Sequence, residues 1–177
     1  MRSGVFIVFA VCLACPRATV AQHAWDLAGG YTYLQDPPDR TNFPAGWMAG
    51  ADVAITDWLS VVVDVSRHWQ STLDVDLSAS AITGGLRASA RIGRLTEFAQ
   101  LLAGVAHSSS SVVGVTSAEN DFAIQPGGGV DYPSGRRFAV RVEIDYRAIA
   151  GGIGPPIADP RHQFRFVWAL IYRHPSR

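Results

Sequence analysis

Charged side chains occupy alternate positions in the segment 137–149, RFAVRVEIDYRAI, and these residues are the ones in this chain best suited to chemistry. Arg141, Glu143, Asp145 and Arg147 would share one face of an extended strand, because successive side chains of a strand point to opposite sides. Asp64 with Glu143 or Asp145 could serve as a general acid and a general base. Buried ionic groups need partners, however, and guanidinium groups stand beside the carboxylates here. We therefore expect a structural network of ion pairs.

His107 and Ser109, in VAHSSSS, form a second candidate pair. A serine beside a histidine can act as an acyl-transfer nucleophile if a carboxylate orients the imidazole ring. The spacing of the sequence identifies no such carboxylate, and the pair lies where a strand-like segment runs into a serine-rich stretch. We expect the start of a solvated loop and keep lipid hydrolysis as an alternative.

The sequence predicts no cofactor, no metal site and no nucleic-acid partner. The glycines of PGGG at 126–129 are not followed by the lysine and hydroxyl residue of a phosphate-binding loop. The five histidines have no common ligand spacing. The 15 basic residues, all arginines, balance 15 acidic residues and form no basic run interleaved with aromatic residues.

The first 21 residues have the pattern of a secretory signal peptide. Arg2 precedes an apolar run at 5–14, and small residues at Thr19 and Ala21 predict cleavage after Ala21. A lipoprotein signal, with Cys15 as the new N-terminus, is the weaker alternative. The apolar run ends at Pro16, short of the roughly 20 residues that a membrane-spanning helix needs. We expect two parts: a cleavable signal peptide at 1–21 and one domain at 22–177.

Eight strand-like segments follow, separated by connections of two kinds. Three connections are short, whereas the four at 35–45, 70–76, 108–120 and 151–160 are longer and polar. Strict alternation of short and long connections is the pattern of an antiparallel up-and-down meander, and closing eight strands into a barrel removes the exposed edges. The expected strands are 24–34, 46–56, 58–68, 77–92, 96–107, 121–132, 136–149 and 161–173.

Each strand has one apolar and one polar face, and two kinds of barrel fit this pattern. A soluble lipocalin-like barrel would bind a small apolar ligand inside, whereas a transmembrane barrel has an apolar band outside and a polar lumen. Aromatic residues near the strand ends favour the transmembrane barrel, because amphipathic rings prefer the membrane interfaces. Phe138 and Tyr146, eight residues apart, would span about 20 Å of height in a tilted strand, close to the apolar band of such barrels.

Two sets of side chains follow from this choice. The expected interface aromatics are Trp25, Trp47, Trp58, Phe138, Tyr146, Trp168 and Tyr172. The expected lumen charge network consists of Asp26, Asp52, Asp64, Arg87, Arg91, Asp131, Arg141, Glu143, Asp145, Arg147 and Arg165. Within it, Asp64, Arg87 and Arg165 are the expected partners of the charged row at 141–147.

The signal peptide, the eight alternating segments and the aromatic-rich last strand resemble the small OmpA/OmpX-type outer-membrane barrels. FAIQPGGGVDYPSGRRFAVRVEIDYR is similar to the penultimate hairpin of the outer-membrane beta-barrel domain family. The resemblance implies an eight-stranded antiparallel up-and-down transmembrane barrel with short periplasmic turns and long extracellular loops, in the outer membrane of a Gram-negative-type bacterium. Such barrels usually end on an aromatic residue that the assembly machinery reads. Tyr172 could fill this role, although RHPSR follows it.

The expected function is therefore non-enzymatic: an envelope structural or surface-interaction role, with a lumen filled by side chains that conducts little. The expected partners are outer-membrane lipids, the outer-membrane assembly machinery and an extracellular ligand of the loops. The lipocalin-like carrier and the lipid hydrolase remain the alternatives.

Overall fold

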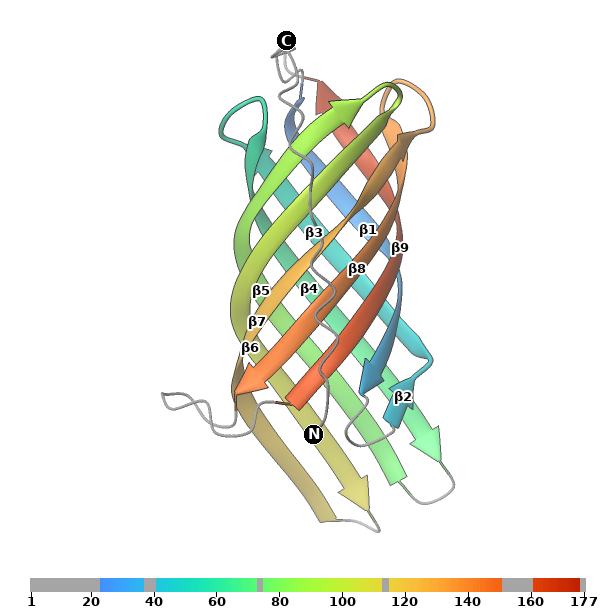
Figure 1. Cartoon of the computed structure of the whole chain (residues 1–177). Helices are drawn as coiled ribbons and strands as arrows, with labels where there is room; N and C mark the ends of the chain where they lie inside the picture. The colour runs from blue at the N-terminus through green and yellow to red at the C-terminus, as the bar shows by residue number, and fades with distance from the viewer. Residues whose placement is uncertain (1–22, 37–40, 73–74, 113–114, 151–160, 176–177) are drawn as a thin grey trace, which may run out of the picture.

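The computed structural model describes residues 23–36, 41–72, 75–112, 115–150 and 161–175, and these form one antiparallel sheet (Figure 1). The signal peptide expected at 1–21 lies outside the described residues. No helix in the described part of the chain is long and apolar enough to cross a membrane. The strands are β1 (His23–Asp36), β2 (Thr41–Phe43), β3 (Ala45–Ala54), β4 (Leu59–Thr72), β5 (Val75–Ile92), β6 (Leu95–Val112), β7 (Val115–Pro133), β8 (Phe138–Ala150) and β9 (Arg161–Pro175).

The sheet closes into a barrel because its first and last long strands pair with each other. β1 pairs with β3, each later strand pairs with the next, and β9 returns to β1 in a register that includes Tyr31↔Trp168. β2 pairs only with the end of β1, through Leu34↔Phe43 and the two pairs that follow. The predicted eight-stranded antiparallel up-and-down barrel is thus confirmed, with one short additional strand that lies within the connection expected at 35–45.

Two of the connections expected to be long consist largely of strand. β4 continues to Thr72 before β5 begins at Val75, and β6 continues to Val112 before β7 begins at Val115. The serine-rich stretch after His107 therefore belongs to a paired strand rather than to a loop. Its polarity was misleading, because the backbone of this stretch pairs with β5 and β7 although its side chains are polar. The connection at 151–160 lies outside the described residues.

The three short turns lie together at one end of the barrel, which we call the short-turn end (Figure 1). They are residues 55–58, 93–94 and 134–137, at the top of the view. Gly93 and Gly135 supply the positive φ angles of two of them, +62° and +118°, which a residue with a Cβ adopts only under strain. In the third turn, Thr56 Oγ1 accepts a hydrogen bond from the Leu59 amide at 3.0 Å.

The wall of the barrel is apolar outside and largely polar inside. On β8, Val140, Val142 and Ile144 are 44–50% exposed, whereas the alternate residues are buried. The same division holds on β4 and β9, where Val61, Val63, Trp168 and Leu170 face outward. The interior also contains small apolar clusters, one of which consists of Ala81, Ala106, Ala123 and Ile149. The barrel is therefore filled by side chains.

Candidate functional site: the lumen charge network

The inward face of β8 carries four charged side chains in a row. Arg141, Glu143, Asp145 and Arg147 are each at most 3% exposed. The period of two in this strand places them inside, because the apolar residues between them face outward. Ionic groups at this depth are costly unless they are paired, so their partners on other strands determine whether the interior is stable.

Arg165 of β9 is the centre of the network. Its guanidinium group lies 2.7 Å from Asp64 Oδ1, 2.7 Å from Asp145 Oδ2 and 3.0 Å from Glu143 Oε1. Asp64 receives two of its N–H groups, in the fork geometry that guanidinium and carboxylate share. One fully buried cation thus holds three carboxylates from two strands that are not adjacent, β4 and β8.

Arg87 of β5 forms a second centre nearer the short-turn end. It pairs with Asp52 at 2.8 Å and lies 3.8 Å from Glu143 Oε2. Gln100 of β6 joins the two centres, because its oxygen accepts two hydrogen bonds from Arg87 while its NH₂ group donates to Glu143 and Asp145 at 3.0 Å. The Phe98 ring lies beside this centre, with the Arg87 and Arg141 guanidinium carbons 4.4 and 4.5 Å from its centroid.

Arg141 and Arg147 have partners of different kinds. Arg141 forms a two-bond pair with Asp131 on the neighbouring strand β7, at 2.7 and 2.9 Å. Arg147 has no carboxylate within ion-pair distance among the described residues; it donates to Gln125 Oε1 at 2.8 Å and to Ser66 Oγ at 3.2 Å. Ser66 lies on β4, which is diametrically opposite β8 in the eight-stranded ring. This contact crosses the full width of the lumen.

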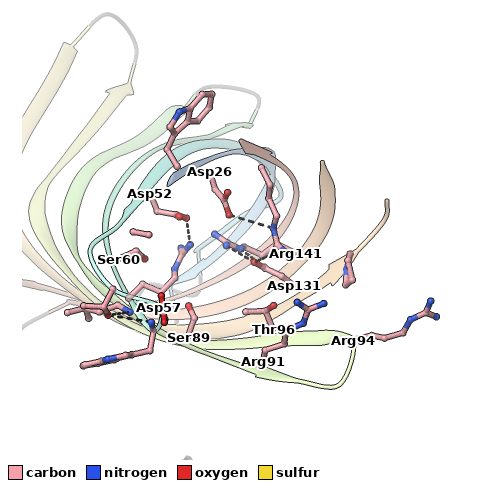
Figure 2. Close-up of a pocket in the computed structure, with 18 residues that line it drawn as sticks. Asp26, Asp52, Asp57, Ser60, Ser89, Arg91, Arg94, Thr96, Asp131 and Arg141 are labelled. Carbon is pink, nitrogen blue, oxygen red and sulfur yellow. Dashed lines mark hydrogen bonds and ion pairs between the residues drawn. The ribbon is translucent and has the colours of Figure 1, made fainter. Parts of the chain in front are cut away.

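A solvent-open cavity of about 240 Å³ lies at the short-turn end, between the network and the short turns (Figure 2). Asp26, Asp52, Asp131 and Arg141 line its inner part. Arg173 of β9 approaches both Asp26, at 3.6 Å, and Asp131, at 3.1 Å. Arg91 was expected in the lumen network but is exposed at this mouth. It lies on the inward face of β5, but four residues closer to the turn than the buried Arg87.

The structure therefore brings together ten of the eleven residues expected in the lumen. Of the partners expected for the β8 row, Arg165 pairs with Glu143 and Asp145, and Arg87 lies 3.8 Å from Glu143, whereas Asp64 pairs with Arg165 of β9 and not with β8. Sequence reasoning missed Gln100, Phe98, Arg173 and Ser66 as members of the network. Gln100 and Phe98 lie on the inward face of a strand whose outward face is mainly apolar, so the alternation contained a signal for both. Among the described residues, no group of three His, Cys, Asp or Glu side chains is placed to hold a metal ion.

The expected interface aromatics lie on the outside of the barrel, but not all lie at strand ends. Trp25, Phe138 and Tyr172 are close together at the short-turn end, with ring centroids of neighbours 5.6–6.0 Å apart, and Trp58 is exposed in the turn 55–58. Tyr146 packs on Phe164 and Trp47 is near the start of β3, toward the opposite end. Trp168 is in the middle of β9, beside Tyr31 at 6.1 Å.

His107 and Ser109 both lie in β6, on the same side of the strand. The His107 ring nitrogen Nδ1 is 2.8 Å from the side-chain oxygen of Asn120 on β7. An amide oxygen can fix the orientation of the ring, but it carries no charge to stabilise an imidazolium as the carboxylate of a catalytic triad does. The pair thus has a group that orients the histidine ring, but that group carries no charge to stabilise the ring when it is protonated.

An eight-stranded antiparallel barrel with an apolar outer wall and an ion-paired interior has the architecture of the small outer-membrane barrels. No protein-family model and no curated protein matches the chain by sequence. Solved structures match it in fold. The chain is similar to neisserial surface protein A, with a TM-score of 0.68, 10% identity, and coverage of 88% of this chain and 99% of that one.

Two further structures have the same fold. The Yersinia pestis attachment invasion locus protein Ail has a TM-score of 0.56 and 11% identity, over 85% of this chain and 96% of that one. The N-terminal barrel domain of Pseudomonas aeruginosa OprF has a TM-score of 0.54 and 8% identity, over 88% of this chain and all of that domain. At these identities the similarity establishes the fold.

Proposed function

We propose that this chain is an integral outer-membrane protein whose barrel spans the bilayer. The inverted polarity of the wall carries the proposal: 24 large hydrophobic side chains on the described strands and turns are 36–61% exposed, while charged residues fill the interior. A soluble protein rarely exposes apolar surface on this scale. The lipocalin-like alternative requires the apolar faces to line the interior, and here they point outward.

We further propose a non-enzymatic role in envelope structure or surface interaction. The buried carboxylates are held by arginines or glutamines rather than presented to a substrate, which supports a structural role for them. β6 and β7, with 18 and 19 residues, are longer than the apolar band requires. Eighteen strand residues tilted by about 40° rise roughly 45 Å, against a band of about 25 Å. Their hairpin would project from the membrane surface, where it could contact a partner.

Cell fractionation and gel mobility test the membrane placement. We expect the protein in the detergent-extracted outer-membrane fraction, and we expect its mobility to change on boiling, because a closed barrel resists detergent until it is heated. Recovery from the soluble periplasm without detergent would contradict the proposal. The lipid-hydrolase alternative is tested separately: lipid deacylation that disappears in Ser109→Ala, with folding retained, would replace the non-enzymatic role.

A further inference from the structure

Exposed arginines are concentrated at the short-turn end of the barrel. Arg94 lies in the turn 93–94, Arg136 and Arg137 in the turn 134–137, and Arg91 at the cavity mouth; all four are exposed. In Figure 2, Arg94 points away from the lumen at the outer edge of this end. Among the described residues, none of the four has a carboxylate within ion-pair distance, in contrast to Arg87, Arg141, Arg165 and Arg173 inside.

These arginines lie next to the outermost apolar side chains of the wall. Ile92 and Leu95, which flank the turn 93–94, are 52% and 36% exposed, and Phe138, which follows Arg137, is 45% exposed. The turns 93–94 and 134–137 are also neighbours in space, because β6, which follows the first turn, pairs through Thr96↔Asp131 with β7, which precedes the second. The result is a basic rim at the edge of the apolar band, defined by Arg94, Arg136 and Arg137.

Among the described residues of the short-turn end, exposed arginines outnumber exposed acidic residues. The exposed acids near the short turns are Asp57 and Glu97. At the opposite end, the exposed charged residues among those whose side chains the structure describes are Arg67 of β4 and Glu119 of β7. Exposed positive charge is therefore in excess at the short-turn end.

We propose that the basic rim binds the headgroups of anionic phospholipids in the leaflet at the short-turn end of the barrel. A guanidinium group matches a phosphate through two parallel hydrogen bonds, and it remains charged at all physiological pH values. The proposal depends on the membrane placement, because the rim is at headgroup height only when the apolar band is in a bilayer. An arginine near an anionic membrane surface contributes about a fivefold preference, and salt weakens the effect.

Lipid-selective quenching of tryptophan fluorescence tests the proposal in the full barrel. In a reporter chain carrying Trp47→Phe, Trp69→Phe and Trp168→Phe, the remaining tryptophans, Trp25 and Trp58, are both at the short-turn end. The chain is reconstituted into phosphatidylcholine bilayers containing a fixed small fraction of brominated phosphatidylglycerol or of brominated phosphatidylcholine. The ratio of the two quenching constants gives the preference of the rim for the anionic lipid.

We expect the anionic lipid to be favoured by about fivefold or more at low salt, and the preference to fall as salt is added. The triple variant Arg94→Gln, Arg136→Gln, Arg137→Gln should reduce the ratio to about one. Arg67→Gln is the matched control, because Arg67 is also exposed and unpaired among the described residues but lies toward the opposite end of β4. It should leave the ratio unchanged.

The outcomes distinguish failure of the membrane placement from failure of the proposed lipid site. Heat-modifiable mobility of each variant shows that the barrel is folded and inserted, and its absence in the reporter chain would contradict the membrane placement itself. Equal quenching by the two lipids in an inserted barrel would overturn the lipid site and leave the membrane placement intact; this is also the result expected if the rim binds a periplasmic protein instead. Equal loss of preference in the triple variant and in Arg67→Gln would likewise overturn it.

Discussion

At the scale of single residues, Arg165 determines whether the interior is electrostatically satisfied. It is fully buried and is the shared partner of Asp64, Glu143 and Asp145. Removing one member of a buried ion pair destabilises a protein by more than the intact pair stabilises it. The remaining charge has no partner and no access to water. Here a single substitution would leave Asp64 without its arginine and would remove the shortest ion pairs of Glu143 and Asp145.

We expect Arg165→Met to lower the free energy of unfolding by roughly 3–5 kcal/mol. The measurement is urea unfolding of the barrel in lipid vesicles at neutral pH, followed by heat-modifiable mobility. Arg136→Gln, which removes an exposed turn arginine, should change the free energy by less than about 0.5 kcal/mol. If the two variants unfold at the same urea concentration, the network does not stabilise the barrel.

Gly127 gives a second residue-scale prediction, because the lumen has no room for a side chain there. A Cβ at Gly127 would overlap the carboxylate of Asp145, whereas a Cβ at Gly29 would meet nothing within 4 Å. We expect Gly127→Ala to cost roughly 1–3 kcal/mol by displacing Asp145 from Arg165. Gly29→Ala should be neutral or slightly stabilising, because alanine restricts the unfolded chain more than glycine does. Equal unfolding midpoints would contradict the tight contact.

At the scale of elements, β8 shows how one strand serves two environments. Its charged row requires polar partners inside, and its apolar row requires a nonpolar surrounding outside. A register shift by one residue would exchange the two rows, so burial fixes the pairing with β7 and β9 strongly. Pairs such as Asp131↔Arg141 contribute further, because the partners also share an ion pair.

A charge introduced on the outward row should therefore be costly in a bilayer. We expect Val142→Arg, midway between Phe138 and Tyr146, to destabilise the barrel by about 2–4 kcal/mol in vesicles. Ser134→Arg, in the exposed turn 134–137, should cost no more than about 1 kcal/mol, as expected near the interface. If Val142→Arg is as stable as the parent, the outward face of β8 does not contact lipid.

At the scale of the whole molecule, the lumen is crossed by side chains at several levels. Arg147 reaches Ser66 on the opposite wall, and Arg165 and Arg87 connect strands that are not neighbours. Eight strands enclose an interior just wide enough for side chains to fill. The cavity at the short-turn end therefore ends at the network instead of continuing through the barrel.

We expect no steady conductance of nanosiemens size when the folded barrel is incorporated into a planar bilayer. Ions would have to pass the Arg165 centre, where the guanidinium group and three carboxylates are already in contact at 2.7–3.0 Å. Stable open channels of nanosiemens size in single-channel recordings would show that the network rearranges to form a pore.

The sequence predicts the barrel and most of the interior because apolar and polar residues alternate along the strands. The prediction fails where a strand does not alternate. Alternation reports a strand with different environments on its two faces, so β3, β4, β8 and β9 were recognised along most of their length. The extensions of β6 and β7 beyond His107 have no apolar face, and the three-residue β2 is too short to show a period. Alternation also shows which face of a strand a residue lies on, but not how far along the barrel axis it lies. The exposed Arg91 and the buried Arg87 therefore could not be distinguished from the sequence.

The pairing of β1 with β9 has a consequence for the order of events during synthesis. The first and last long strands must meet, so the ring cannot close until the segment Arg161–Pro175 has been synthesised and is free to pair. A chain truncated before Arg161 would lack both the closing strand and Arg165, leaving β1 and β8 as open edges that favour aggregation. Contacts this distant in sequence form slowly. The unfinished polypeptide therefore carries unpaired strand edges for as long as its two ends are apart.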